Sequence, residues 1–221
     1  CRAWRTVTGT LPCRITFFFE GEEESGSPSL VPFLKENAAE LGADLVLICD
    51  TGMVARGVPS IASQLRGMLK DEFTIHGPRI DLHSGSYGGM AMNPIRVLTR
   101  ILGGLHDAEG RVQVPGFYDD VIEPSAEVLE QWRGLNFDEA GFLGAVGLKD
   151  PAGETGRMGL ERLWSRPTGE INGITGGYTG AGFKTVLPSE ARAKVSFRLV
   201  AGQDPLKLRE SFRAWVRAQV P

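Results

Sequence analysis

Apolar and polar positions follow two different patterns along the chain. Residues 14–19 (RITFFF) and 44–50 (DLVLICD) are short apolar runs without alternation, as is typical of strands buried on both faces of a parallel sheet. Between them, apolar residues recur at helical spacing from Leu30 to Leu41, with Ser27 and Pro28 suited to the helix start and Gly42 to its end. The order strand, helix, strand predicts a crossover between parallel strands, whose carboxyl ends then lie at one sheet edge.

From Gly67 onwards the apolar positions alternate with polar ones, which predicts strands with one wet face. Two such strands cover residues 69–76 and 191–199, and a third lies near residues 170–175. Helices are predicted near residues 93–105 and 124–132, and a last one, striped by Leu208, Phe212 and Trp215, begins at Asp204 and Pro205. The sequence therefore predicts a partial α/β domain over residues 1–66 and an α+β domain, an antiparallel sheet flanked by helices, over residues 67–221.

Composition limits the classes of function. The chain has 221 residues, of which 42% are apolar, and a formal net charge of -3, so it carries no basic surface for nucleic acid. No apolar run approaches the roughly 20 residues of a membrane span, and no signal peptide is visible, although a truncated start could hide one. Cys1, Cys13 and Cys49 show no paired or metal-binding spacing, and their odd number favours a reducing compartment, which we take to be the cytoplasm.

The strongest chemical signal is an acidic run at the end of the first predicted strand. Residues 20–24 hold four acids in five positions, and a small-residue turn follows. If the backbone stays extended, Glu23 and Glu24 point to opposite sides, so one can bind a cation while the other takes a proton from a bound water. Asp50 ends the second strand at the same edge, and such oxygen ligands suit Zn²⁺, Mn²⁺ or Mg²⁺. The alternatives are a solvated acidic loop and, for Asp50, a turn or helix-cap residue.

Four strings in fixed order resemble a known family. They are EGEEESGS, LICD, DLHSGSYGG and GYTGAGFKTVLPSEARAKVSFRLV. Together they resemble the dinuclear-metal peptidases and deacylases, a family that includes carnosinase-type dipeptidases, aminoacylases, succinyl-diaminopimelate desuccinylase and acetylornithine deacetylase, and the carnosinase-like branch is the most similar. The resemblance implies two divalent ions, zinc first and manganese or cobalt as alternatives. It also implies that Glu23 is the general base and that Glu24 and Asp50 are metal ligands.

The same resemblance gives roles to three residues of the second domain, which it identifies as a lid that forms a homodimer interface. His83 in DLHSG would reach the active site of the partner subunit and stabilise the oxyanion, while Thr185 and Arg198 would hold the substrate. From the residues alone, His83 also fits an exposed turn and Arg198 a solvated charge on the wet face of its strand.

The chain departs from the family pattern at three places. The upstream His-x-Asp motif, the segment with the metal-bridging aspartate and the histidine ligand near the carboxyl terminus are all absent from the sequence. We therefore expect residues 1–66 to be part of a metallopeptidase catalytic domain, in a fragment that supplies two of five metal ligands and is inactive alone. The expected activity of the complete enzyme is hydrolysis of amide bonds in dipeptides or small peptides.

Two other activities and two near-miss motifs complete the alternatives. An N-acyl amino acid deacylase of the same family and a non-catalytic dimerisation or peptide-binding module remain open. Residues 177–185 nearly match a phosphate-binding loop, but Phe183 separates the glycine from the lysine. Residues 84–88 nearly match a nucleophile elbow, but Ser84 stands where the turn requires glycine. Nucleotide binding and serine hydrolysis are therefore disfavoured.

Overall fold

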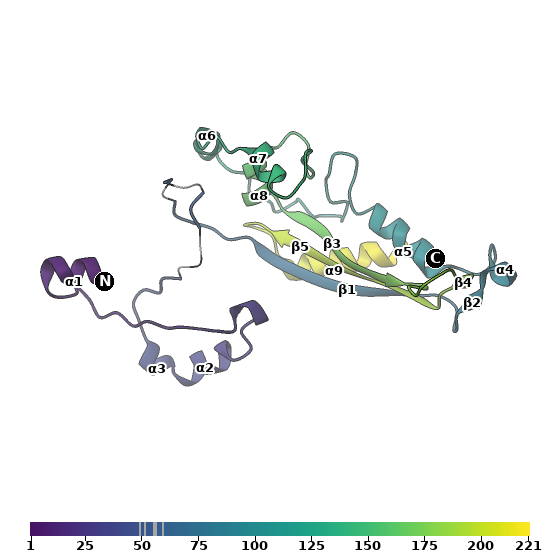
Figure 1. Ribbon diagram of the computed structural model, residues 1–221, viewed down its shortest axis with the longest axis horizontal. Helices are drawn as coiled ribbons and strands as arrows, with labels where there is room; N and C mark the ends of the chain where they lie inside the picture. Colours follow the sequence, from purple (N-terminus) through teal and green to yellow (C-terminus); the bar gives the residue numbers. More distant parts are fainter. Residues whose placement is uncertain (49, 51, 55–56, 59) are drawn as a thin grey trace. The chain divides into compact units, whose positions relative to one another are not determined.

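The computed structural model describes residues 1–48, 50, 52–54, 57, 58 and 60–221. The chain divides into two compact units, Cys1–Ile61 and Ala62–Pro221 (Figure 1). No helix in the described ranges combines the length and apolar content required to cross a membrane.

The first unit, Cys1–Ile61, contains short helices: α1 (Arg2–Thr8), the 3₁₀ turn η1 (Glu23–Ser25), α2 (Leu30–Glu36) and α3 (Ala38–Leu41). The helix predicted from Leu30 to Leu41 is thus present, but it is interrupted at Asn37. The backbone N–H and the side-chain amide of Asn37 both donate to the carbonyl of Phe33, at 3.0 and 2.9 Å, which ends the first helix there.

The two predicted parallel strands are not formed. The described residues of 14–19 and 44–50 contain no strand, and Cys49 lies outside the described residues. The first segment still alternates, because Phe17 stacks on Phe19 at 6.3 Å while Phe18 packs on Phe33 at 5.5 Å. In the second segment Leu45, Val46, Leu47 and Ile48 are 77–83% exposed. A parallel strand pair requires neighbouring strands and covering helices, which the described part of this unit does not supply.

The second unit, Ala62–Pro221, is built on a three-stranded antiparallel sheet, as predicted. Its strands are β1 (Gly67–His76), β3 (Thr168–Gly176) and β5 (Glu190–Leu199), in the spatial order β1-β5-β3. Apolar and polar residues alternate along β5, so the strand has one buried and one outward face. The buried residues are Ala191, Ala193, Val195, Phe197 and Leu199.

Helices α5 (Pro94–Gly103) and α9 (Pro205–Arg217) pack on the buried face of this sheet. Each begins at a side-chain cap: Asn93 accepts from the N–H of Ile95 at 2.9 Å and Asp204 from the N–H of Leu206 at 2.8 Å. At the centre of the core, the rings of Phe197 and Phe212 meet edge to face at 5.1 Å. The opposite face of the sheet carries the exposed charged side chains.

Residues 123–166, which we call the helical cap, lie between α5 and β3 in the sequence. They contain α6 (Ala126–Gly134), α7 (Glu139–Gly144) and α8 (Gly159–Trp164). The predicted helix at 124–132 corresponds to α6. Helices α7 and α8 were not predicted, because six-residue helices that contain glycine leave little periodicity to detect.

A buried ion network anchors the helical cap. Arg166, 2% exposed, donates through Nε and Nη2 to Glu154, 6% exposed, at 2.6 and 2.8 Å. Arg166 also pairs with Glu123, which accepts from Arg157 at 2.8 and 2.9 Å. Partial burial pushes the pKa of Glu123 upwards, but the hydrogen bonds and charges of Arg157 and Arg166 outweigh it, so the pKa is lowered. The network joins segments more than 30 residues apart.

Replacing Arg166 with Met should strongly destabilise the Ala62–Pro221 unit. Removing one partner leaves the Glu154 carboxylate buried and uncompensated, which costs about 3–5 kcal/mol of unfolding free energy. The control is Arg133→Met, because Arg133 pairs with Glu130 at the surface and such pairs contribute about 0–1 kcal/mol. Urea unfolding followed by circular dichroism measures both, and equal midpoints for the two variants would contradict a stabilising role for the network.

Candidate functional site

The acidic run forms a turn rather than an extended segment. Glu23 and Glu24 lie in η1, so the expectation that an extended backbone directs them to opposite sides is wrong. The turn is closed by Glu22, whose carboxylate accepts from the backbone N–H of Ser29 at 3.0 Å and from its hydroxyl at 3.2 Å. Gly26 and Ser27 both have positive φ, which reverses the chain towards α2.

Glu23, Glu24 and Asp50, the predicted acidic site residues, are exposed. Within the described residues none of them forms an ion pair or accepts a side-chain hydrogen bond, so their oxygens remain available. Among the residues that the structure describes, no three His, Cys, Asp or Glu side chains lie close enough together to form a metal site. The donor chemistry therefore fits a divalent cation, but further ligands are required to complete its coordination.

His83 and Thr185 are brought together by a second, two-stranded sheet. Strands β2 (Leu82–His83) and β4 (Val186–Leu187) pair antiparallel, with His83 opposite Val186. This register places the Thr185 hydroxyl 3.2 Å from Nε2 of His83, although the residues are 102 apart in sequence. The backbone N–H of Ser84 also donates to the Thr185 carbonyl at 3.1 Å.

The hydrogen bonds of His83 fix which ring nitrogen is the donor. The N–H of Gly85 donates to Nδ1 at 3.1 Å, in the cap of the short helix α4 (Ser84–Tyr87). Because Nδ1 accepts this bond, the proton of the neutral ring is assigned to Nε2. The imidazole thus presents an N–H on the side of the Thr185 hydroxyl, where it can donate to a carbonyl oxygen.

Arg198 lies at the other end of the unit. It is exposed on β5, between Met68 of β1 and Thr168 of β3. In Figure 1, β2, β4 and α4 lie at one end of the three-stranded sheet, and β5 ends at the opposite end. Eight residue steps separate Glu190 from Arg198, which is roughly 27 Å at about 3.4 Å per residue. A single dipeptide therefore cannot contact His83 and Arg198 of the same chain.

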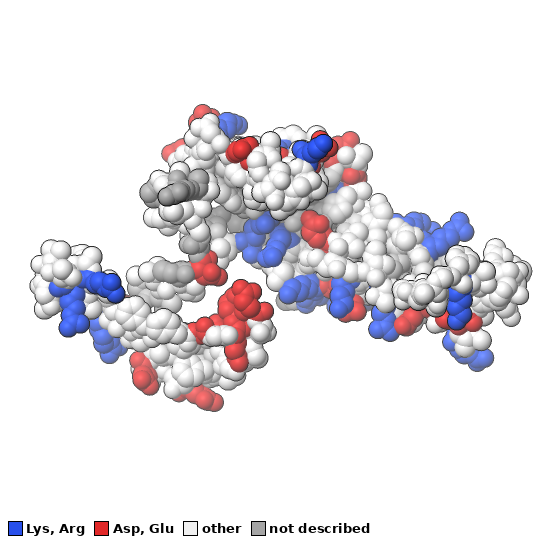
Figure 2. Space-filling view, viewed as in Figure 1, with Lys and Arg blue, Asp and Glu red and all other residues white. Residues whose placement is uncertain are grey.

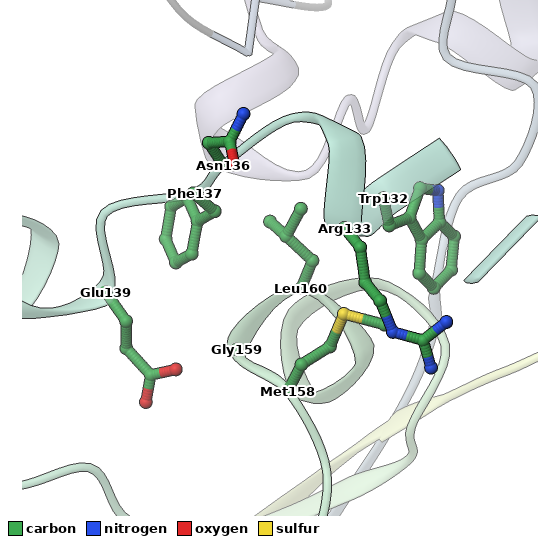
Figure 3. A pocket seen from close by; sticks show the side chains of 8 residues that line it. All are labelled: Trp132, Arg133, Asn136, Phe137, Glu139, Met158, Gly159 and Leu160. Atoms are coloured by element: carbon green, nitrogen blue, oxygen red, sulfur yellow. The ribbon is translucent and has the colours of Figure 1, made fainter. Parts of the chain in front are cut away.

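Two cavities of the Ala62–Pro221 unit are lined by none of the predicted site residues. One, of about 250 Å³, lies beside β2 and β4 and is lined by Asp81, Thr175, Thr179, Ser189 and Arg192 among others. The other, of about 210 Å³, lies in the helical cap, where Trp132, Phe137, Met158 and Leu160 surround it (Figure 3).

These features define a class of protein. The unit is a helix-backed antiparallel sheet with an exposed histidine, His83, on a small two-stranded arm, and with the predicted substrate residue Arg198 at its other end. The family model for the peptidase dimerisation domain matches residues 64–221, and the chain belongs to this family.

Relatives and solved structures give the same assignment. The human Beta-Ala-His dipeptidase is 30% identical over 200 residues, and the Cys-Gly metallodipeptidase of Saccharomyces cerevisiae is 32% identical over 209 residues; these cover 90% and 93% of this chain. The matches cover only 39% and 43% of those proteins, so the chain spans about two fifths of the length of the curated relatives it matches.

Among solved structures, human carnosine dipeptidase 1 is similar with a TM-score of 0.80 at 28% identity. The match covers 99% of this chain and 46% of the carnosine dipeptidase chain. A metallo-carboxypeptidase from Sulfolobus solfataricus is similar with a TM-score of 0.77 at 35% identity. This match covers 90% of this chain and 46% of the carboxypeptidase chain. The predicted resemblance to carnosinase-type dipeptidases and the predicted antiparallel lid are thus confirmed.

Proposed function

We propose that this chain is part of a metal-dependent peptidase that hydrolyses dipeptides or small peptides. The observation that carries the proposal is similarity to metallodipeptidases over about nine tenths of the chain, a span that includes both the acidic run and the His83 arm. The remaining metal ligands would come from residues outside this sequence, since the described residues gather no complete set. Alone, the chain is then inactive.

In this proposal the acidic run supplies the proton chemistry. Glu24 and Asp50 would each hold a divalent ion, zinc first and manganese or cobalt as alternatives, and the two ions when bound would lower the pKa of water and polarise the scissile carbonyl. Glu23 would take the proton from that water and pass it to the leaving amine. The exposed and unpaired state of the Glu23 carboxylate in the described residues supports this role.

His83, Thr185 and Arg198 would bind the substrate. The Nε2–H of His83 would donate to the developing oxyanion in place of the Thr185 hydroxyl, which would then contact the substrate, while the N–H of Gly85 at Nδ1 would hold the imidazole in that orientation. Arg198 would bind the substrate carboxylate, because its planar guanidinium matches a carboxylate with two parallel hydrogen bonds.

The separation of Arg198 from His83 favours a homodimer with shared sites. A dipeptide spans about 7 Å, far less than the roughly 27 Å along β5 between Arg198 and Glu190, the residue at the end of β5 on the side of the His83 arm (Figure 1). A substrate can contact both only if His83 and Thr185 come from one subunit and Arg198 from the other. We therefore propose a homodimer formed through residues 67–221, and a cytoplasmic location based on the odd cysteine count.

A substrate panel tests this function against its alternatives. The active enzyme should hydrolyse β-alanyl-histidine or cysteinylglycine at least about tenfold faster, in kcat/KM, than the matching N-acetyl amino acids. The reverse preference would establish the N-acyl amino acid deacylase. No hydrolysis by any form of the protein that binds metal would establish the non-catalytic dimerisation or peptide-binding module.

A further inference from the structure

Two arginines lie side by side on the outer face of the sheet. Arg198 is directly opposite Met68 in the β1–β5 pair, and Arg66 is two residues before Met68. Arg66 lies just before β1, which begins at Gly67, and continuing the alternation of the strand by one residue puts it on the face of Met68 and Arg198. The charge of Arg198 acts on Arg66, as expected of near neighbours. Diagonal neighbours in an antiparallel pair are about 7–8 Å apart, which long side chains bridge. Both guanidinium groups can therefore reach one small ligand.

The outer face is basic where this pair lies. Figure 2 shows Lys and Arg side chains gathered over the end of the sheet where β1 begins and β5 ends. The immediate cross-strand neighbours of Arg198 are Met68 and Thr168, neither of which carries a charge. The residues directly opposite Arg198 thus do not offset its charge, and the nearest acidic position of the sheet is Glu170 of β3, diagonal to Arg198 on the same exposed face.

Neither arginine has a carboxylate partner within the described part of the chain. Other arginines of the unit are neutralised: Arg192 donates to Glu190 at 2.6 Å and Arg213 to Asp71 at 2.8 Å. Arg66 and Arg198 form no ion pair there. Burial lowers the pKa of the Arg66 guanidinium, and the charge of Arg198 lowers it further. Two like charges held together without a counter-ion are a common arrangement for binding an anion.

We propose that Arg66 and Arg198 together form a carboxylate-binding subsite, with Arg66 as its second guanidinium. The inference deepens the proposed function, in which Arg198 alone was assigned to the substrate carboxylate. Two guanidinium groups can hold both oxygens of one carboxylate, and a ligand with two carboxylates neutralises both charges. The subsite therefore selects a free carboxyl terminus, and it prefers a terminal residue with an acidic side chain.

The experiment uses malonate as a dicarboxylate probe and malonamide as its neutral analogue. Arginine side-chain Nε–Hε signals of the 221-residue chain are followed by NMR during titration at low salt. The variants are Arg66→Gln, Arg198→Gln and Arg66→Lys, and the control is Arg192→Gln, which removes a charge from the same face of β5 where Glu190 already pairs with it. Thermal unfolding of each variant confirms that the fold is intact.

Malonate should bind and malonamide should not. Arg66→Gln and Arg198→Gln should each raise the Kd about tenfold or more, Arg66→Lys should raise it less, and Arg192→Gln should leave it within about twofold. If Arg198→Gln weakens binding but Arg66→Gln does not, Arg66 is excluded while the role of Arg198 stands. If malonate fails to bind the wild-type chain, the subsite is contradicted, while the catalytic role of Glu23 is tested separately by turnover.

Discussion

Replacing Glu23 with Gln should reduce turnover of a dipeptide by about 10²–10⁴-fold in the active enzyme, because the amide cannot accept the proton that a general base removes from water. The substitution keeps the size and polarity of the side chain. Since Glu23 is assigned to proton transfer and Glu24 and Asp50 to the metals, metal content should stay near that of the wild type. Steady-state kcat and elemental analysis on the same preparation measure both quantities.

The matched control for this change is Glu22→Gln. Glu22 belongs to the same acidic run, but its carboxylate is already occupied by the N–H and hydroxyl of Ser29. The amide oxygen of Gln can still accept from Ser29, so kcat should stay within a few-fold of the wild type. Near-normal turnover in the Glu23 variant would remove Glu23 from the mechanism, whatever the Glu22 variant shows.

Replacing His83 with Ala should lower kcat by about 10²–10³-fold, the usual cost of losing one donor to a developing oxyanion. The effect should appear mainly in kcat, because the donor acts on charge that develops in the transition state. The control is His76→Ala, since His76 is exposed at the end of β1, where its Nδ1 lies 3.8 Å from a carboxylate oxygen of Glu190.

Mixing the His83→Ala protein with the inactive Glu23→Gln protein tests whether the sites are shared. In a mixed dimer, one site combines an intact Glu23 from one subunit with an intact His83 from the other. With random exchange, half of the dimers are mixed and each has one working site, so roughly a quarter of wild-type activity should return. Demonstrated subunit exchange without recovery would show that each site uses its own His83.

The fold of the Ala62–Pro221 unit was predictable from its alternation. Strand β5 buries every second residue and β1 turns Leu69 and Ile75 into the same core, and the caps Asn93 and Asp204 lie where the sequence indicated helix starts. Such elements carry their own pattern because one face meets a core within the same unit. The apolar runs at 14–19 and 44–50 also carry a strand pattern, but a parallel strand forms only when neighbours cover both faces, and propensity alone does not supply them.

The site was predictable only in part. DLHSG and KTV indicated His83 and Thr185 through a family resemblance, yet the 3.2 Å contact between them depends on the β2–β4 register, which two-residue strands do not reveal in a sequence. Arg66 carried no motif, and only its place just before β1 and its interaction with the charge of Arg198 distinguish it. The 3₁₀ turn at Glu23 was missed because the strand before it was expected to continue as extended backbone.

The most direct test of the central claim is metal removal and return in the active enzyme, followed by dipeptide hydrolysis. Because the proposal assigns Glu24 and Asp50 to two divalent ions, a chelator should abolish hydrolysis, and added zinc, manganese or cobalt should restore it to saturation at about two equivalents per chain. Full activity after verified removal of metal would contradict the account, since Glu23 alone could not activate a water at the required rate.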